Sequence, residues 1–221
     1  MKRTFLACVF FLNLSGCEFP PLQGEAQSNS AAAVGKSSDW LLAKASWLTI
    51  EVHKGGILAK VGHDHILASH ELTGQMSINR TVGHVRIPLN SLTIDESVLR
   101  QKLGWEPIDS EQSIKGTRRN MNRYVLQPDR FSDVVVDVQC PVPFHNTCHV
   151  SIHLHGMTQE IADMPMQIKE TGNQVVVTGS STLLQTDYGI KPFSVLGGGL
   201  RVENPVLIRY YLVFEKSGLP D

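Results

Sequence analysis

The sequence lacks the features that mark several large functional classes. Its 20 Lys and Arg residues are balanced by 21 Asp and Glu residues, with no basic run, which argues against a nucleic acid partner. It contains no G-x-S-x-G, H-E-x-x-H, phosphate-binding loop or dinucleotide fingerprint. It has no internal repeat and no apolar segment long enough to cross a bilayer as a helix. We therefore expect a protein that binds rather than catalyses, and no enzymatic activity.

The first residues resemble a bacterial lipoprotein signal. Lys2 and Arg3 form a short positive segment, and Thr4 to Leu14 is an apolar stretch too short to span a membrane. Leu14-Ser15-Gly16-Cys17 matches the lipobox pattern, which implies cleavage after residues 1–16 and acylation of Cys17. Two or more acyl chains anchor a protein stably, at ~0.8 kcal/mol per buried methylene. The alternative is an ordinary cleaved signal peptide with an incidental cysteine.

The remaining chain divides into three parts. Residues 17–39 are small and polar and cannot offset their own ordering entropy, so they are expected to form a lipidated flexible tether with a reach of roughly 25 Å. Residues 40–216 are expected to form one domain, followed by a short tail at 217–221. Glu18 stands where a non-Asp residue favours sorting to the outer membrane. The expected location is the cell envelope, at the periplasmic face of the outer membrane.

Apolar residues alternate with polar ones through most of residues 45–214. Such alternation is typical of strands with one buried face. Gly55-Gly56 suggests a hairpin turn between two of them. The apolar series are Leu48, Ile50 and Val52; Ile57, Ala59 and Val61; Leu72, Gly74, Met76 and Ile78; Val85, Ile87 and Leu89; Leu92 and Ile94; Val134, Val136 and Val138; Val150, Ile152 and Leu154; and those within 174–184 and 205–214. About eight strands with short connections predict an all-β fold, an antiparallel sandwich or barrel.

One stretch breaks this alternation. Residues 95–126 are charged, and Ile114, Met121 and Val125 lie seven and four positions apart, as on one face of a helix. Pro128 is expected to end this helix, because the residue before a proline avoids the helical conformation. We therefore expect one or two helices lying over one mouth or one side of the β structure.

Several phrases together resemble the YceI-like family of bacterial envelope proteins. They occur in order over roughly residues 45–215, nearly the whole folded domain. The phrases are Gly62-His63-Asp64-His65, Thr117 to Leu126 followed by Phe131-Ser132, His155-Gly156-Met157-Thr158-Gln159, Asp187-Tyr188-Gly189-Ile190 to Phe193, and Gly197-Gly198-Gly199-Leu200. The Gly-His-Asp-His phrase resembles one sub-branch of that family.

The resemblance implies an eight-stranded, lipocalin-like antiparallel barrel. Some family members hold a polyisoprenoid or a similar amphiphile inside, and homodimers are common. A barrel of this size is filled by side chains or holds one slender ligand. Small residues at alternating positions would leave room for it, although the same residues also relieve packing where strands bend. The ligand-lining candidates are Ala59, Gly74, Gly179, Asp187, Tyr188 and Phe193.

The nine histidines include two pairs with a spacing of two. His63 and His65 form one pair, and His153 and His155 form the other. Residues two apart in a strand share a face, and four imidazoles would suffice for Zn or Cu. The alternative is that His63, Asp64 and His65 form a hydrogen-bonded turn that locks the end of the barrel. The metal ion therefore stays one hypothesis beside a polar cluster.

Two cysteines remain once Cys17 is acylated. Cys140 and Cys148 flank a turn-like segment, and facing positions of antiparallel strands are close enough for a disulfide. An oxidising periplasm would allow the bond. The alternative is two free thiols, or thiolates that assist the histidines in metal binding.

Three functions follow from these observations. The first is a lipid-anchored barrel that binds or carries a hydrophobic or amphiphilic small molecule, of polyisoprenoid type. The second is a metal-binding or redox-associated periplasmic protein that uses the histidines. The third is a structural or stress-related protein that acts through its surface. No cofactor is required, beyond a possible bound lipid or metal ion.

Overall fold

The computed structural model describes residues 40–77, 79, 81–108 and 110–217. The predicted signal peptide, the acylated Cys17, the tether and most of the predicted tail lie outside the described residues. Within the described residues no helix has the length and apolar character needed to cross a membrane.

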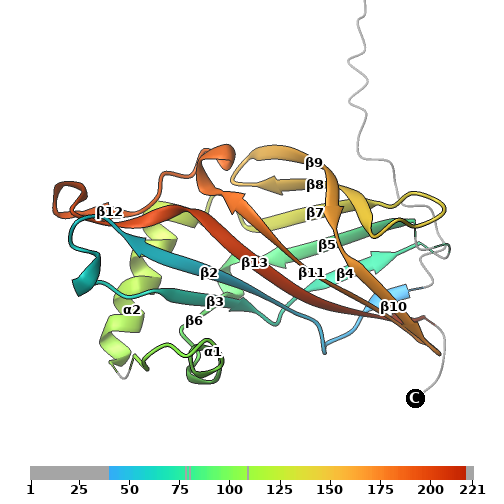
Figure 1. Ribbon diagram of the computed structural model, residues 1–221, viewed down its shortest axis with the longest axis horizontal. Helices are drawn as coiled ribbons and strands as arrows, with labels where there is room; N and C mark the ends of the chain where they lie inside the picture. The colour runs from blue at the N-terminus through green and yellow to red at the C-terminus, as the bar shows by residue number, and fades with distance from the viewer. Residues whose placement is uncertain (1–39, 78, 80, 109, 218–221) are drawn as a thin grey trace, which may run out of the picture. The chain divides into compact units, whose positions relative to one another are not determined.

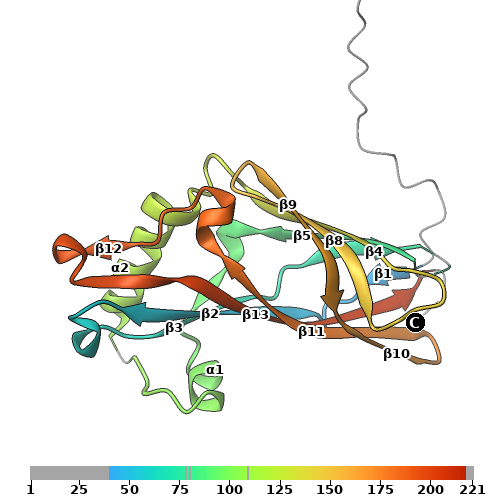
Figure 2. The ribbon, with the colours of Figure 1, turned by 45° about the horizontal axis from the view of Figure 1, so that its top comes forward.

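The described unit is a single antiparallel sheet that curves round an apolar interior (Figures 1 and 2). The predicted all-β, lipocalin-like class is confirmed, but the strand count differs, with thirteen strands in place of eight. The strands are β1 (Trp40–Leu42), β2 (Trp47–Gly55), β3 (His65–Ser69), β4 (Thr73–Met76), β5 (Val82–Pro88), β6 (Thr93–Ile94), β7 (Asp133–Gln139), β8 (Thr147–Leu154), β9 (Met157–Pro165), β10 (Gln167–Thr171), β11 (Gln174–Leu184), β12 (Ser194–Val195) and β13 (Leu200–Lys216).

The pairing explains the larger count. β1 and β2 both pair with β13, and β4 and β3 continue the sheet from β1 and β2 respectively. β5 pairs with β4 and β6 pairs with β3. β1 and β2 are therefore two parts of one interrupted stretch. The same holds for β3 and β4, for β5 and β6, and for β9 and β10. Apart from the two-residue β12, the strands make up eight stretches.

The junction between β9 and β10 closes the sheet. β9 pairs with β8, whereas β10 pairs with β11, and only Met166 separates the two strands. β11 in turn pairs with β13 along its whole length, from Gln174 opposite Glu215 to Leu184 opposite Pro205. Because the chain changes partner at this bend, the eight stretches form a closed ring.

The alternation seen in the sequence sets which side chains face the interior. On β7 the apolar face is formed by Val134, Val136 and Val138, which pack on the main core. The buried centre of that core includes Val150 and Ile152 on β8. A one-residue shift in register would turn these side chains outward, so burial of this face fixes the register.

The helices lie where the alternation stops. They are α1 (Ser97–Lys102), α2 (Glu111–Asn120) and the π-helical turn η3 (Met121–Leu126), which continues α2. Ser110 caps α2 by accepting a hydrogen bond from the Ser113 backbone N–H. η3 ends at Gln127, whose φ of 47° is left-handed, directly before Pro128. α2 lies at one end of the barrel in both views (Figures 1 and 2).

One predicted strand is wrong. Ile57, Ala59 and Val61 do not form a strand but a loop with a short 3-10 turn, η1 (Ala59–Val61). Ile57 is 91% exposed, so its apolar side chain faces solvent rather than the core. The hairpin-like Gly55-Gly56 ends β2, and Gly56 adopts a positive φ of 89°. The returning strand begins only at His65, because the Gly-His-Asp-His segment is engaged in polar contacts described below.

Candidate ligand cavity

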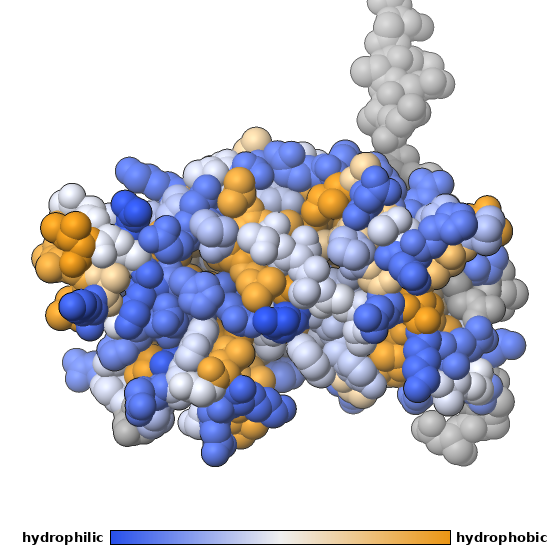
Figure 3. Space-filling view, in the orientation of Figure 1, coloured by the Kyte–Doolittle hydropathy of each residue, from blue (hydrophilic) through white to orange (hydrophobic). Residues whose placement is uncertain are grey.

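The barrel encloses a cavity of about 320 Å³. This lies near the lower end of the range of about 300–1,000 Å³ for small-molecule sites. Most of its walls are apolar. The lining includes Leu48, Ile50, Leu67, Leu72, Met76, Val85, Ile87, Met121, Val125, Val134, Val136, Val138, Cys140, Val150, Ile152, Leu154, Met164, Ile168, Val177, Leu183, Ile190, Phe193, Val206, Ile208, Leu212 and Phe214. The outer surface in Figure 3, by contrast, is mostly hydrophilic with scattered apolar patches.

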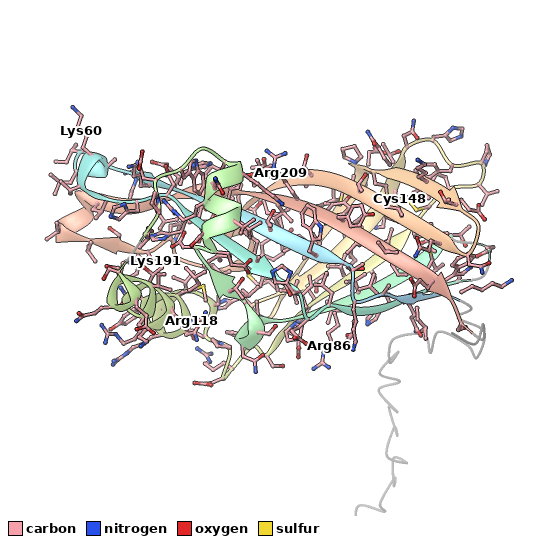
Figure 4. All side chains as sticks on the ribbon, turned by 90° about the horizontal axis from the view of Figure 1, so that it is seen from below. Lys60, Arg86, Arg118, Cys148, Lys191 and Arg209 are labelled. Carbon is pink, nitrogen blue, oxygen red and sulfur yellow. A yellow bond between two sulfur atoms is a disulfide. The ribbon has the colours of Figure 1, made fainter. Side chains whose placement is uncertain are left out.

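The cavity extends along the inside of the barrel. Thr117 and Asn120 of α2 line it, and so does Cys140, which is bonded to Cys148. Figure 4 shows Arg118 of α2 and Cys148 toward opposite ends of the barrel. A cavity of this volume that reaches from α2 to the disulfide is narrow for its length. It therefore suits a slender apolar chain better than a compact ligand.

Only two of the six predicted lining residues line the cavity in the structure. Tyr188 and Phe193 line the cavity. Asp187 is exposed and does not line it, although its backbone carbonyl accepts a hydrogen bond from the Gln159 side chain at 2.6 Å. Ala59 belongs to the η1 loop and is also absent from the lining.

Gly74 and Gly179 let neighbouring groups pack closely against the backbone and do not make room for a ligand. A Cβ at Gly74 would lie 2.6 Å from the backbone carbonyl oxygen of His84 on β5. A Cβ at Gly179 would lie 2.3 Å from the hydroxyl oxygen of Tyr210, whose ring does line the cavity. The second of the two interpretations made from the sequence, relief of packing, therefore fits both glycines.

The Gly-His-Asp-His segment forms a polar network at the start of β3. Asp64 accepts a hydrogen bond from the Lys54 backbone N–H at 2.9 Å and lies 3.4 Å from Nδ1 of His53. The Lys54 ammonium donates to the carbonyl of Gly62 at 2.9 Å. His63 is exposed. Asp64 and Gly62 thus tie the start of β3 to β2, whereas His63 has no hydrogen-bond partner among the described residues and His65 binds Asp95 instead.

His65 is held by a hydrogen bond to a buried carboxylate. Its Nδ1 lies 2.6 Å from Oδ2 of Asp95, whose side chain is fully buried. Oδ1 of Asp95 accepts hydrogen bonds from the Arg100 guanidinium at 2.7 Å and from the Ile66 backbone N–H at 3.1 Å. Arg100, 3% exposed, also donates to the carbonyls of Asp64 and Glu106. Sequence reasoning missed Asp95 and Arg100 as site residues, because they come from a segment without strand alternation.

These contacts keep Asp95 ionised. Burial disfavours the charged carboxylate, but the hydrogen bond and charge of His65, the Ile66 N–H and Arg100 together outweigh it and lower the pKa of Asp95 below 3.8. An ionised Asp95 accepts the Nδ1–H of His65 and so fixes the orientation of the ring. His65 itself lines the cavity.

The two histidine pairs do not converge, which argues against the predicted metal site. His153 is exposed and hydrogen-bonds Thr158 at 3.0 Å. His155 lies in the β8–β9 turn with a φ of 54°, and its ring packs on Phe131 at 4.1 Å between centroids. In the parts of the chain that the structure describes, no group of three or more His, Cys, Asp or Glu side chains is arranged to hold a metal ion. The pattern misled because His155 is not in the strand that carries His153.

The late loop packs against β13 and η3 beside the cavity. Tyr188 of the 3-10 turn η4 (Gln185–Tyr188) is 2% exposed, and burial raises its pKa to about 12. Gln185 donates to the carbonyls of Glu203 and Asn204, which fixes this turn on β13. The ring of Phe193 stacks on Tyr124 of η3, with the centroids 6.2 Å apart. The loop and η3 thus meet next to the cavity.

The structure joins Cys140 and Cys148 in a disulfide with a Cα–Cα distance of 4.3 Å. Cys148 is 1% exposed and belongs to the main core, and Cys140 packs against it. The bond therefore connects the β7–β8 hairpin directly to the wall of the cavity.

The fold and the cavity together define an antiparallel β-barrel with an apolar interior site. No protein-family model matches the sequence, and no curated protein matches it. Among solved structures, the chain is similar to a polyisoprenoid binding domain from Saccharophagus degradans implicated in plant cell wall breakdown, at TM-score 0.58 and 16% identity, over 81% of this chain and 99% of that one. It is also similar to Burkholderia cenocepacia BcnA, at TM-score 0.51 and 10% identity, over 78% and 98%. Identities this low show a shared fold, so the fold that the YceI-like resemblance implies is confirmed.

Proposed function

We propose that this chain is an envelope lipoprotein whose barrel binds or carries a hydrophobic or amphiphilic small molecule of polyisoprenoid type. The apolar cavity inside a closed sheet carries this proposal. An apolar chain placed there would gain about 25 cal/mol for each Å² removed from water. The polyisoprenoid class is supported by the ligand named for the Saccharophagus degradans domain, which shares the fold. Acylation of Cys17, a periplasmic location and a homodimer remain part of the proposal from the sequence.

The alternatives are weaker on specific grounds. A histidine-based metal protein lacks a converging ligand set among the described residues. A structural or stress-related protein would not need an interior cavity, whereas this barrel has one of about 320 Å³. We also propose that the chain is not an enzyme, since the cavity lining is mostly apolar and the sequence contains none of the catalytic motifs named above.

The first test is direct. The protein, purified without detergent where possible, is extracted with organic solvent, and the extract is examined by mass spectrometry for apolar molecules in stoichiometric amount. In parallel, the emptied protein is titrated with the fluorescent apolar dye N-phenyl-1-naphthylamine. We expect saturable binding at one site per chain. A protein that neither retains an apolar molecule nor binds the dye would contradict the proposal.

A matched pair of variants tests whether the dye binds inside the barrel. Val138 lines the cavity, and its neighbour Gln139 is exposed on the other face of β7. Val138→Trp adds volume inside and is expected to weaken dye binding at least tenfold. Gln139→Trp adds the same side chain outside and is expected to leave it unchanged. Equal binding by both variants, each with the circular dichroism of the original protein, would show that the dye binds elsewhere.

A further inference from the structure

Three of the polar side chains that line the cavity come from its α2 end. His65 of β3 lines it, and so do Thr117 and Asn120 of α2, which are three residues apart and so share a helix face. Apart from Tyr210, the walls that continue toward the disulfide are apolar, with Met76, Val138, Cys140, Val150 and Phe214 among them. The cavity therefore has one polar end and a long apolar remainder, which is the pattern of an amphiphile rather than of a plain hydrocarbon.

We propose that His65, Thr117 and Asn120 form a subsite for the polar head of an amphiphilic ligand, and that Asp95 and Arg100 position His65 for this role. This inference rests on the proposed function and names the chemistry of its ligand. The head is a hydroxyl or carbonyl group that exchanges hydrogen bonds with an imidazole, a hydroxyl and an amide. The apolar chain extends toward the Cys140–Cys148 disulfide.

The orientation of His65 is the first physical argument. Its Nδ1 is taken by Asp95 at 2.6 Å, so Nε2 is the ring nitrogen left for a ligand. Asp95 is in turn fixed by Arg100 at 2.7 Å and by the Ile66 N–H at 3.1 Å. A histidine with one nitrogen bound to a buried carboxylate presents the other in a set direction, as in many sites that use imidazole to bind or orient a partner.

The cost of the buried pair is the second argument. The free-energy cost of desolvating an aspartate and an arginine offsets most of the gain from their attraction, so such pairs contribute little to stability. Asp95 also adopts a left-handed φ of 55°, which is uncommon outside glycine. A buried ion pair whose aspartate holds a left-handed backbone and ends on a cavity-lining histidine is better explained by a binding role than by packing alone.

The walls around this end of the cavity are apolar. Leu67, Ile94 and Met121 form a small apolar cluster, against which Ile50 and Ile114 pack. The polar subsite is thus surrounded by apolar walls, where an unpaired polar group is costly. A site of this kind discriminates strongly between ligands whose polar head can form the hydrogen bond and ligands whose head cannot.

The test compares two probes of equal chain length, 1-decanol and n-decane, by displacement of N-phenyl-1-naphthylamine from the full chain. The quantity measured is the ratio of the decane dissociation constant to the decanol dissociation constant. Relative to the original protein, we expect this ratio to fall about tenfold in His65→Leu and several-fold in Thr117→Val, because each variant removes a hydrogen-bonding group that only decanol uses. Leu67→Met, on the same strand as His65, is expected to shift both probes equally.

Two readouts keep the test decisive if His65→Leu folds poorly. Thr117→Val preserves side-chain shape and removes one hydroxyl, and NMR of the unaltered protein reports on His65 directly. We expect decanol, but not decane, to shift the Nε2 resonance of His65. An unchanged ratio in Thr117→Val together with an unmoved His65 resonance would overturn the subsite. If decane still displaces the dye in that case, the proposed function stands. Failure of both probes to displace the dye, or a protein that never binds the dye, would instead overturn the proposed function itself.

Discussion

The ring of Tyr210 on β13 occupies the space that a side chain at Gly179 on β11 would need. The two residues face each other in register, and a Cβ at Gly179 would lie 2.3 Å from the Tyr210 hydroxyl oxygen and 2.6 Å from Cζ. The hydroxyl also reaches the Pro165 carbonyl at 3.5 Å, at the bend where β9 gives way to β10. Burial raises the pKa of Tyr210 to about 12. One aromatic side chain thus packs across the place where the barrel closes.

The contact between these residues predicts a coupled effect on stability. Gly179→Ala is expected to lower the free energy of unfolding by about 1–3 kcal/mol, because the new methyl group overpacks against the ring. Tyr210→Ala removes the obstacle, so the double variant is expected to be more stable than the sum of the single changes predicts, by about 1 kcal/mol. Urea denaturation of the four proteins measures this. Strictly additive effects would show that the ring moves away freely.

Removal of Asp95 is expected to destabilise the protein strongly. Asp95→Asn keeps the shape and tolerates the left-handed backbone, but it leaves the Arg100 charge buried without its carboxylate. Breaking a buried pair in this way costs about 3–5 kcal/mol. The expected result is a lower urea midpoint at pH 7. Lys115→Gln, which breaks the exposed pair with Glu111, is the control and is expected to change the midpoint little.

The same residue predicts a pH dependence. The pKa of Asp95 is lower in the folded protein than its ordinary value of 3.8. Its contribution to stability is therefore fully present above about pH 4 and is lost as the pH falls through the folded pKa. Glu96 and Asp133 also have lowered pKa values and act in the same direction. Denaturation between pH 2 and pH 6 is expected to show a shallower acid loss in Asp95→Asn, and an identical slope would contradict this account.

His155 predicts a second pH effect at higher pH. Burial lowers the pKa of His155 below 6.5, although a hydrogen bond to the Tyr188 backbone opposes it and the charge of Arg130 adds to it. The unfolded chain then binds a proton more readily, so stability falls as the pH drops below about 6.5 and levels off below the folded pKa. NMR titration of the histidine rings measures this pKa directly. A value at or above 6.5 would show that the ring is better solvated than its packing on Phe131 indicates.

The disulfide is expected to stabilise the hairpin that carries it. Cys140 and Cys148 are separated by eight positions, for which loop closure contributes about 2.5 kcal/mol in the chain-entropy description. Cys140→Ala with Cys148→Ala should lower the free energy of unfolding by about this amount, and a reducing agent should do the same to the original protein. Val142→Ala changes an exposed residue of the same loop and serves as the control. An unaltered midpoint in the double alanine variant would contradict the prediction.

The alternation of the sequence determined most of the barrel. β11 spans Gln174–Leu184, as predicted, and the apolar series of β7 and β8 face the interior. The helix ending before Pro128 is also where the sequence placed it. These features depend on neighbouring residues alone, because side-chain direction in a strand and helix termination at proline are local properties. The same local reasoning failed at Ile57, whose alternating pattern continues into an exposed loop.

Only the tertiary structure decided which residues meet. Asp95 and Arg100 come from a charged stretch whose pattern gives no hint that both are buried, and His65 reaches Asp95 across thirty positions. The separation of His155 from His153 likewise depends on where β8 ends, and the packing of Tyr210 on Gly179 depends on the register of two strands. Contacts between distant segments are fixed by strand pairing and closure of the ring. The sequence by itself therefore determined an antiparallel barrel with an apolar inner face, while folding decided the cavity, its polar end and, among the described residues, the separation of the two histidine pairs.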